Sequence, residues 1–449
     1  MVKGISRKRY YLIILVMPWL LMMSCQKPRP KNETTPDNGL ITTTLTTKPI
    51  TLKAYFETGF LVPFKLAQEF SKEYPNVKWD ISSDQYTNLI NETPRLLSGN
   101  NPPDLIRLPT MVSFAKEGLL KNLDGYAKAY GWDKWPQPQI QQNRISADGV
   151  RGSGSLFVMG LNYSLTGVFY NKAEAKKIGM KRPPQTLAEF EGLLAKAKSA
   201  GLLPIMQWGS AKSGMGLIFP LQALMGSLGP IAPVNNWIFQ TKGASLLTPN
   251  NLRAVEHLQA WIKAGYFPPD INALEYTDSN ARFTHGEGVF TFNGDWENAN
   301  YDQFMKDNVG FFLMPPGSKG GQSCAMSSPL TFGIAAHAKN SDAAAFFLNW
   351  VATNPKARQI DVEYGGSSPG GPAGLDLPKV PDDSITKTTL QDGAALFKTG
   401  RVMGFLANAT SSIFAQGWTP ELQKLAGGRT SPEKLLQSVQ AEYESELSH

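Results

Sequence analysis

Cysteine and histidine are scarce in this chain of 449 residues, which holds two cysteines and four histidines. Two cysteines cannot form a disulfide framework, and no histidine has a His, Cys or carboxylate partner at the spacing of a metal site. The sequence also lacks a Gly-rich phosphate loop and a Gly-x-Ser-x-Gly nucleophile motif. We therefore expect no metal and no cofactor, and any enzymatic reading must rest on carboxylates.

The apolar run over residues 10–23 is too short to favour a membrane span. Its 14 residues would rise about 21 Å as a helix, against a hydrocarbon layer of roughly 30 Å. Basic residues at 3–9 precede the run and Ser24-Cys25 follow it, which is the order of an export signal. Residues 1–24 are therefore predicted to be a signal peptide.

Residues 21–25, Leu-Met-Met-Ser-Cys, resemble the lipobox of bacterial lipoproteins, although Met22 stands where that motif prefers leucine. The resemblance implies that Cys25 is acylated, with palmitate among its acyl groups. The lipid would anchor the exported protein to the bacterial cell envelope, at the outer face of the plasma membrane or at a periplasmic or outer-membrane leaflet. An ordinary secreted chain is the alternative. Residues 25–48 have few large apolar side chains and are predicted to be a disordered tether.

The net charge of +7 does not indicate a nucleic-acid partner. Residues 1–24 hold four basic side chains and no acidic one, and residues 25–48 add a further excess of basic residues. The chain from Pro49 onward is close to neutral, so a phosphate-binding surface is not implied.

Hydrophobic periodicity predicts an α/β fold. Alternating residues at 51–56 and 77–81 flank a helical pattern at 63–74, which is the strand–helix–strand unit of a mainly parallel sheet. A long helix is predicted over 187–200, with Thr186 as its N-cap and Glu189 completing a capping box. Further helices are expected over 251–264, 341–351 and 432–447. The Gly- and Pro-rich residues 365–372 are expected to form an irregular loop.

The tryptophan and carboxylate residues suggest two alternative functions, sugar binding and glycoside hydrolysis. Sugar rings stack on aromatic faces, and Trp296 in a polar loop is hard to explain as core packing, whereas Trp261 lies on the apolar face of its helix. Glu287, Asp295 and Glu297 lie close in sequence, and paired acids are what a glycosidase needs. Proximity in sequence is weak support for catalysis.

Five segments resemble the extracellular solute-binding proteins of family 1, the sugar-binding lipoproteins of ABC importers, of the maltose-binding type. The segments are 67–77, 97–106, 167–205, 286–296 and 340–355. They include Gly167-Val168-Phe169-Tyr170-Asn171-Lys172 and Phe292-Asn293-Gly294-Asp295-Trp296. By their order and spacing, the five segments extend the resemblance over nearly all of residues 51–445.

The resemblance implies a two-lobed fold of the type II periplasmic binding proteins, with crossing strands as a hinge and a ligand cleft between the lobes. The N-terminal lobe would comprise residues 51–161 and 325–370, and the C-terminal lobe residues 162–324 and 371–449. The positions implied to contact the ligand are Phe56, Glu57, Thr58, Thr110, Asn162, Tyr163, Trp208, Asp295, Trp296, Ser367 and Ser368.

The resemblance further implies a monomer that captures a sugar or oligosaccharide without altering it and delivers it to the membrane subunits of an ABC permease. Two alternatives stay open. One is a secreted hydrolase that uses Glu287 and Asp295, and the other is a receptor for a non-sugar solute, which a cleft rich in Lys and Arg would favour.

Overall fold

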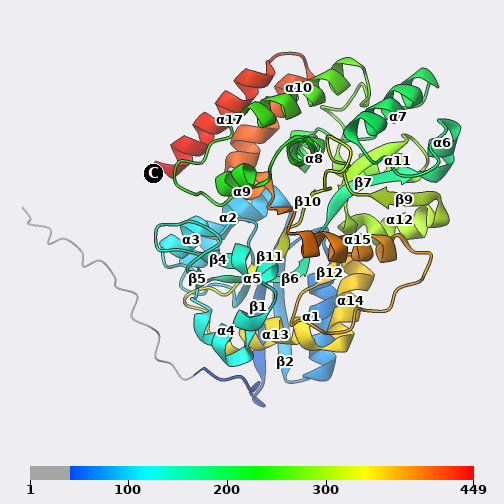
Figure 1. The fold of residues 1–449 in the computed structure, drawn as a ribbon. Coiled ribbons are helices and arrows are strands. Elements are labelled where there is room, and N and C mark those ends of the chain that lie inside the picture. Colours follow the sequence, from blue (N-terminus) through cyan, green and yellow to red (C-terminus); the bar gives the residue numbers. More distant parts are fainter. Residues whose placement is uncertain (1–40, 449) are drawn as a thin grey trace, which may run out of the picture. The chain divides into compact units, whose positions relative to one another are not determined.

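The computed structural model describes residues 41–448, shown in Figure 1. The predicted signal peptide, the lipidation residue Cys25 and the tether up to residue 40 lie outside the described residues. Within residues 41–448, no helix is long and apolar enough to cross a membrane.

Residues 41–48 differ from the predicted tether. The Asn76 side-chain amide donates hydrogen bonds to the carbonyl oxygens of Thr46 and Lys48, at 2.7 and 3.1 Å. Ile41 and Leu45 pack against the core of the first sheet. This stretch is therefore attached to the folded body, because the side chains of Ile41 and Leu45 bury apolar surface against that core.

The secondary structure is mixed, with both helices and strands along the described chain. The strands are β1 (Ile50–Glu57), β2 (Val77–Asp84), β3 (Leu105–Arg107), β4 (Arg144–Ile145), β5 (Ser155–Leu156), β6 (Val158–Tyr163), β7 (Thr166–Asn171), β8 (Phe290–Gly294), β9 (Val309–Phe312), β10 (Ala325–Met326), β11 (Pro329–Gly333), β12 (Ser368–Pro369) and β13 (Val402–Met403). The α-helices are α1 (Leu61–Glu73), α2 (Tyr86–Ser98), α3 (Val112–Lys116), α4 (Asp124–Tyr130), α5 (Gln137–Ile140), α6 (Lys172–Lys177), α7 (Leu187–Ser199), α8 (Ile218–Leu228), α9 (Ala232–Ile238), α10 (Pro249–Lys263), α11 (Tyr276–Thr284), α12 (Asn298–Phe304), α13 (Ser341–Thr353), α14 (Pro355–Gly365), α15 (Ile385–Thr399), α16 (Thr419–Ala426) and α17 (Pro432–Leu447). Short 3-10 turns include η4 (Asp295–Glu297) and η6 (Leu406–Asn408), and η7 (Ile413–Trp418) is a π-helix.

The first sheet has six strands in the order β12-β6-β11-β3-β1-β2. β1 is parallel to both β2 and β3, whereas β11 is antiparallel to β3 and β6, and β12 is antiparallel to β6. Strands β1, β2, β3 and β6 therefore all point the same way. Their carboxyl ends meet at one edge of the sheet, which is the edge where ligands bind in open α/β sheets.

The second sheet has three strands in the order β8-β7-β9, with β8 and β9 both antiparallel to β7. Only Ser164 and Leu165 separate β6 of the first sheet from β7 of the second. The chain returns to the first sheet through residues 327–328, just before β11, and reaches β12 through residues 366–367. We call residues 164–165, 327–328 and 366–367 the crossing region.

Each sheet has its own buried core, and we call the two halves the first and second lobes. The first-lobe clusters draw on β1, α1, β3, β6, β11 and α13, including Phe56, Phe70 and Phe347. The second-lobe clusters draw on β7, α7, α8, α10, β8 and α17. In Figure 1 the strands of the first sheet lie below those of the second.

Local sequence signals agree with the observed helices in most places. The predicted helix 187–200 is α7, and the Thr186 hydroxyl accepts the Glu189 backbone N–H at 3.1 Å. The Glu189 carboxylate accepts from Gln185 N–H rather than from Thr186, so the reciprocal bond of the capping box is displaced by one residue. The expectation that residues 365–372 hold no regular structure was wrong, because Ser368 and Pro369 pair with Tyr163 and Asn162 as β12.

Candidate ligand-binding site at the junction of the two sheets

The carboxyl edge of the first sheet meets the second lobe at the crossing region. The Asp295 N–H, just after β8, donates to the Leu165 carbonyl at 2.9 Å. The Asn298 side-chain amide, at the start of α12, donates to the Gly366 carbonyl at 3.2 Å. The Asn298 bond joins the two lobes, and the Asp295 bond ties the residue after β8 to the crossing region, so the predicted site residues near them are held in one region.

Asp295 is buried at this junction, with 2% of its surface exposed. The Ser367 hydroxyl donates to its Oδ1 at 2.7 Å, and burial raises the pKa of the carboxyl well above its ordinary value while that hydrogen bond opposes the rise. A Cβ at Gly366, whose φ is +64°, would lie 2.1 Å from the Asp295 carbonyl oxygen. In this structure Asp295 and Ser367 join the lobes, and their contact with a ligand stays a prediction.

Asn162 belongs to the same buried group. Its side-chain amide donates to Asp361 Oδ1 at 2.9 Å, and Asp361 is fully buried in α14. Burial raises the pKa of Asp361, and the nearby Asp295 raises it further, whereas Asn162 and Arg358 lower it. Sequence reasoning missed Asp361, because nothing in the local pattern of α14 distinguishes its buried carboxylate from a solvated one.

Glu57 ends β1 and forms an ion pair with Arg107 at the end of β3, with 3.3 Å between Oε2 and Nε. Arg107 Nη1 also donates to the hydroxyl of Thr331 at 3.1 Å. Burial raises the pKa of Glu57, and the Arg107 charge opposes that rise. Among the described residues, Glu57 Oε2 is buried and has no hydrogen-bond donor with good alignment. Arg107 was not predicted, although its place at the end of a buried strand was visible.

Trp296 is half-buried in η4 and takes part in a hydrogen-bonded chain. Its Nε1–H donates to the Tyr276 hydroxyl at 2.8 Å, and that hydroxyl donates to the Glu297 carboxylate. The Asn300 amide donates to the other Glu297 oxygen at 2.9 Å. Burial raises the pKa of Glu297, and these two hydrogen bonds lower it. The orientation of the indole ring is thus fixed through Tyr276.

The Trp296 ring is the first of a row of neighbouring aromatic rings whose other members are half-buried phenylalanines. We call Trp296, Phe219, Phe405 and Phe414 the aromatic strip. Ring centroids lie 6.0 Å apart from Trp296 to Phe219, 5.4 Å from Phe219 to Phe405, and 6.1 Å from Phe405 to Phe414. The Phe219 and Phe405 rings are stacked at 19°. The strip joins α8, η4, η6 and η7, so no local sequence window could have revealed it.

Trp208 packs against the aromatic strip and is not exposed to solvent. It is 3% exposed, and its ring packs edge-on against Tyr276 at 4.7 Å and lies 5.4 Å from Phe219. Phe56 is fully buried and packs edge-on against Phe64 and Phe332. Each ring is thus enclosed by other aromatic groups in this structure, and its contact with a ligand stays a prediction.

The remaining predicted residues lie along the same edge of the first sheet. Thr58 is exposed, and its N–H donates to the Asp84 carbonyl at 2.8 Å. Thr110 is buried three residues after β3. Tyr163 is buried and donates from its hydroxyl to the Gln139 carbonyl at 3.1 Å, while Ser368, paired with it in the sheet, is half-buried.

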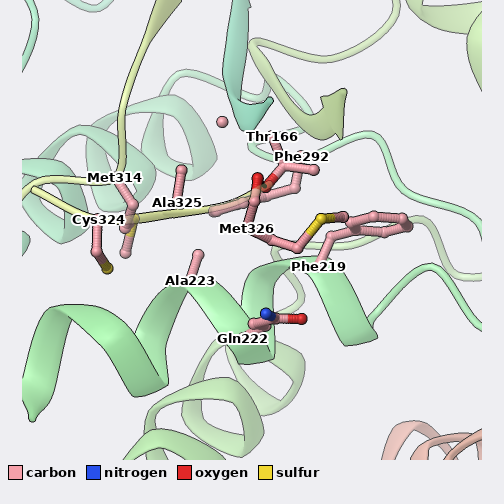
Figure 2. A pocket seen from close by; sticks show the side chains of 10 residues that line it. Thr166, Phe219, Gln222, Ala223, Phe292, Met314, Cys324, Ala325 and Met326 are labelled. Carbon is pink, nitrogen blue, oxygen red and sulfur yellow. Dashed lines mark hydrogen bonds between the residues drawn. The ribbon is translucent and has the colours of Figure 1, made fainter. Parts of the chain in front are cut away.

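A pocket beneath Phe219 is too small to be the main site. It is lined by Thr166, Gly167, Phe219, Gln222, Ala223, Phe292, Met314, Cys324, Ala325 and Met326. Its cavity volume, about 10 Å³, is at the lower limit for one water molecule. Figure 2 shows Met326 beside Phe219, both at one side of this pocket. The pocket is a small gap in the second-lobe core.

Neither a metal nor a reactive thiol is indicated in the described part of the chain. No group of three His, Cys, Asp or Glu side chains within residues 41–448 could hold a metal ion. Cys324 is buried, and burial raises the pKa of its thiol to about 11.

The sequence model of the bacterial extracellular solute-binding proteins matches residues 53–358. A multiple sugar-binding protein of Streptococcus mutans is 23% identical over 312 residues, which cover 68% of this chain and 70% of that protein. Among solved structures, a chitin oligosaccharide binding protein matches with a TM-score of 0.74, 18% identity, and coverage of 89% of this chain and 99% of that one. The solute-binding protein RafE in complex with raffinose matches with a TM-score of 0.68, 19% identity, and coverage of 89% and 100%. These likenesses confirm the predicted two-lobed α/β fold.

Proposed function

The chain belongs to the family of bacterial extracellular solute-binding proteins, and from that premise we propose that it is the sugar- or oligosaccharide-binding component of an ABC importer. The observation that carries this proposal is the aromatic strip at the junction of the two lobes. Apolar C–H faces of sugar rings stack on such rings, and the neighbouring polar groups satisfy the hydroxyls. The names of the sugar-binding relatives support the same substrate class.

The ligand would lie between the aromatic strip and the carboxyl edge of the first sheet. Glu57 Oε2 would accept a hydrogen bond from a ligand hydroxyl, and Thr58, Thr110, Tyr163 and Ser368 would line the same edge. A hydrogen bond to a charged group contributes about 1.5–3 kcal/mol when the site is closed from water. Trp296 would stack on one ring face, because the Tyr276–Glu297 chain holds it in place.

The crossing region would act as the hinge. The predicted lobe boundaries, at residues 161/162, 324/325 and 370/371, would lie close to the crossing region, since the two buried cores separate along the chain near these positions. Ligand contacts from both lobes form only on closure. A ligand therefore shifts an open–closed equilibrium by its preference for the closed form.

Export and anchoring extend the proposal to the cell envelope. A signal peptide over residues 1–24 and acylation of Cys25 would hold the protein as a monomer on the membrane, near its permease. A tether ending near residue 40 would then set the reach of the receptor and its effective concentration. Replacing Cys25 by Ser should release the protein from the membrane fraction, and retention of that variant would contradict the anchor.

The hydrolase alternative has little support from the geometry. Glu287 is exposed and lies 4.0 Å from Arg282, whereas Asp295 is buried and bonded to Ser367. Arg107, the basic residue beside Glu57, is already paired with that carboxylate. Its charge is therefore not available to an anionic solute. We propose binding without chemistry on the ligand.

Calorimetric titration of the purified protein with a panel of mono- and oligosaccharides tests the proposal. We expect saturable binding of at least one sugar, and recovery of that sugar intact by mass spectrometry. Binding of none of the panel would contradict the sugar assignment, and recovery of a cleaved product would contradict the non-enzymatic one.

A further inference from the structure

The hairpin formed by β4 and β5 belongs to the first lobe but reaches the second. Within its own lobe, Arg144 Nη1 lies 3.2 Å from Asp124 Oδ1, and Leu123 N–H donates to the Leu156 carbonyl at 2.8 Å. Between the two strands, the Arg151 backbone N–H donates to the Phe239 carbonyl at 2.9 Å. Phe239 caps α9 and packs against the second-lobe core.

The Arg151 side chain makes contacts in both lobes. Its Nε and Nη2 donate to the Gln142 carbonyl of the first lobe, at 3.3 and 3.1 Å. Its Nη1 donates to the Asn408 carbonyl of the second lobe at 3.4 Å, and its guanidinium carbon lies 5.1 Å from the centre of the Phe239 ring. One planar cation thus spans the boundary between the lobes.

This guanidinium is buried, and no carboxylate of the described residues pairs with it. The residue is 7% exposed, and none of the ion pairs found within residues 41–448 includes it. Burial lowers its pKa to about 10. A buried charge is costly unless polar groups surround it, and here those groups are two carbonyls and an aromatic face. Two of these three partners belong to the second lobe, so the arrangement is complete only when the lobes are together.

The contact also lies beside the aromatic strip. Asn408 is in η6, three residues after Phe405, and the Asn408 N–H donates to the Phe405 carbonyl at 3.0 Å. In Figure 1, β4 and β5 lie on the left of the molecule, whereas α14 and β12, next to the crossing region, lie on the right. In this view the hairpin that contains Arg151 and the elements next to the crossing region therefore lie on different sides of the molecule.

We propose that Arg151 is a positioning residue, a clasp that holds the β4–β5 hairpin against α9 and η6 and thereby fixes Phe405 and favours the closed form. The clasp rests on the proposed function in one respect, namely that a ligand binds between the lobes. Removing it would weaken ligand binding although Arg151 itself need not touch the ligand. Coupling of this kind typically changes affinity by about 5- to 150-fold.

The test compares Arg151→Ala with Arg144→Ala in the full chain. Arg144 is a matched control because it is an arginine of the same hairpin whose ion pair stays within the first lobe. For a sugar that the wild-type protein binds, we expect Arg151→Ala to weaken affinity at least about fivefold and Arg144→Ala to change it less than twofold. Equal affinities in the two variants would overturn the clasp.

Amide hydrogen exchange and small-angle scattering give readouts that need no ligand. Arg151→Ala should speed exchange at residues 404–409 and enlarge the radius of gyration, whereas Arg144→Ala should do neither. If the wild-type protein binds no sugar, the proposed function fails and these two measurements decide the clasp alone. Should Arg151→Ala fail to fold, Arg151→Lys serves instead, because lysine keeps the charge but lacks the fork that reaches both carbonyls. Wild-type exchange and dimensions in that variant would equally overturn the clasp.

Discussion

The Ser367 hydroxyl donates to Asp295 Oδ1 at 2.7 Å, and this bond joins the segment before β12 to the segment after β8. These two residues are 72 positions apart in the chain and lie in different lobes. Asp361, bonded to Asn162, lies near enough for its charge and that of Asp295 to affect each other. Two buried carboxyl groups therefore lie beside the crossing region, and the stability of this part of the protein must depend on their protonation.

Replacing Asp361 by Asn should raise stability at neutral pH. Burial raises the folded-state pKa of Asp361 above the unfolded value near 4, so its protonated form is favoured in the folded protein. Its contribution is fully present below the unfolded pKa and is lost as pH rises through the folded pKa. In Asp361→Asn, the melting temperature should therefore fall less than in the wild type as pH rises above 4. The exposed Asp383→Asn is the control, and parallel pH profiles of wild type and Asp361→Asn would contradict the prediction.

Trp296→Ala should lower affinity for the bound sugar at least about tenfold, which corresponds to about 1.4 kcal/mol, while the protein stays folded. The lost stacking face is the cause. Tyr276→Phe should cause a smaller loss, because it removes the hydroxyl that orients the indole and keeps the ring itself. Calorimetric titration and circular dichroism measure both effects. An unchanged affinity in Trp296→Ala would remove Trp296 from the site.

Gly294→Ala should displace the indole ring of Trp296. A Cβ at position 294 would lie 2.0 Å from the Trp296 ring, so the indole must move. We expect weaker sugar binding and a changed tryptophan fluorescence spectrum. Gly192→Ala is the control, because in helix α7 its Cβ meets nothing within 4 Å, and the substitution should stabilise by up to about 1 kcal/mol. Equal sugar affinity in the two variants would refute the argument.

Arg107→Ala should destabilise the protein by about 3 kcal/mol at neutral pH, since it leaves the Glu57 carboxylate buried without its cation. The double variant Glu57→Gln/Arg107→Met should recover most of that loss, because no buried charge remains. Urea denaturation of Glu57→Gln, Arg107→Met and the double variant forms a double-mutant cycle. Additive effects would show that the two side chains do not interact.

Local signals in the sequence were sufficient for most elements. The apolar periodicity of α1, α10 and α17 and the N-cap at Thr186 depend on neighbours three or four residues away, so a short window contains them. β12 was missed because its two residues gain their structure only from pairing with β6, about 200 positions earlier.

The sequence by itself determined the fold class and the resemblance to the solute-binding family, because periodicity, capping and ordered motifs are properties of the chain. It also placed Trp296 correctly outside the core. Tertiary structure alone decided that Asp295 and Ser367 join the lobes, that Phe56 and Trp208 are enclosed, and that Phe219, Phe405 and Phe414 form one strip. Burial and pairing between distant segments fix those roles, and the free energy of a buried charge or ring depends on neighbours that no local pattern contains.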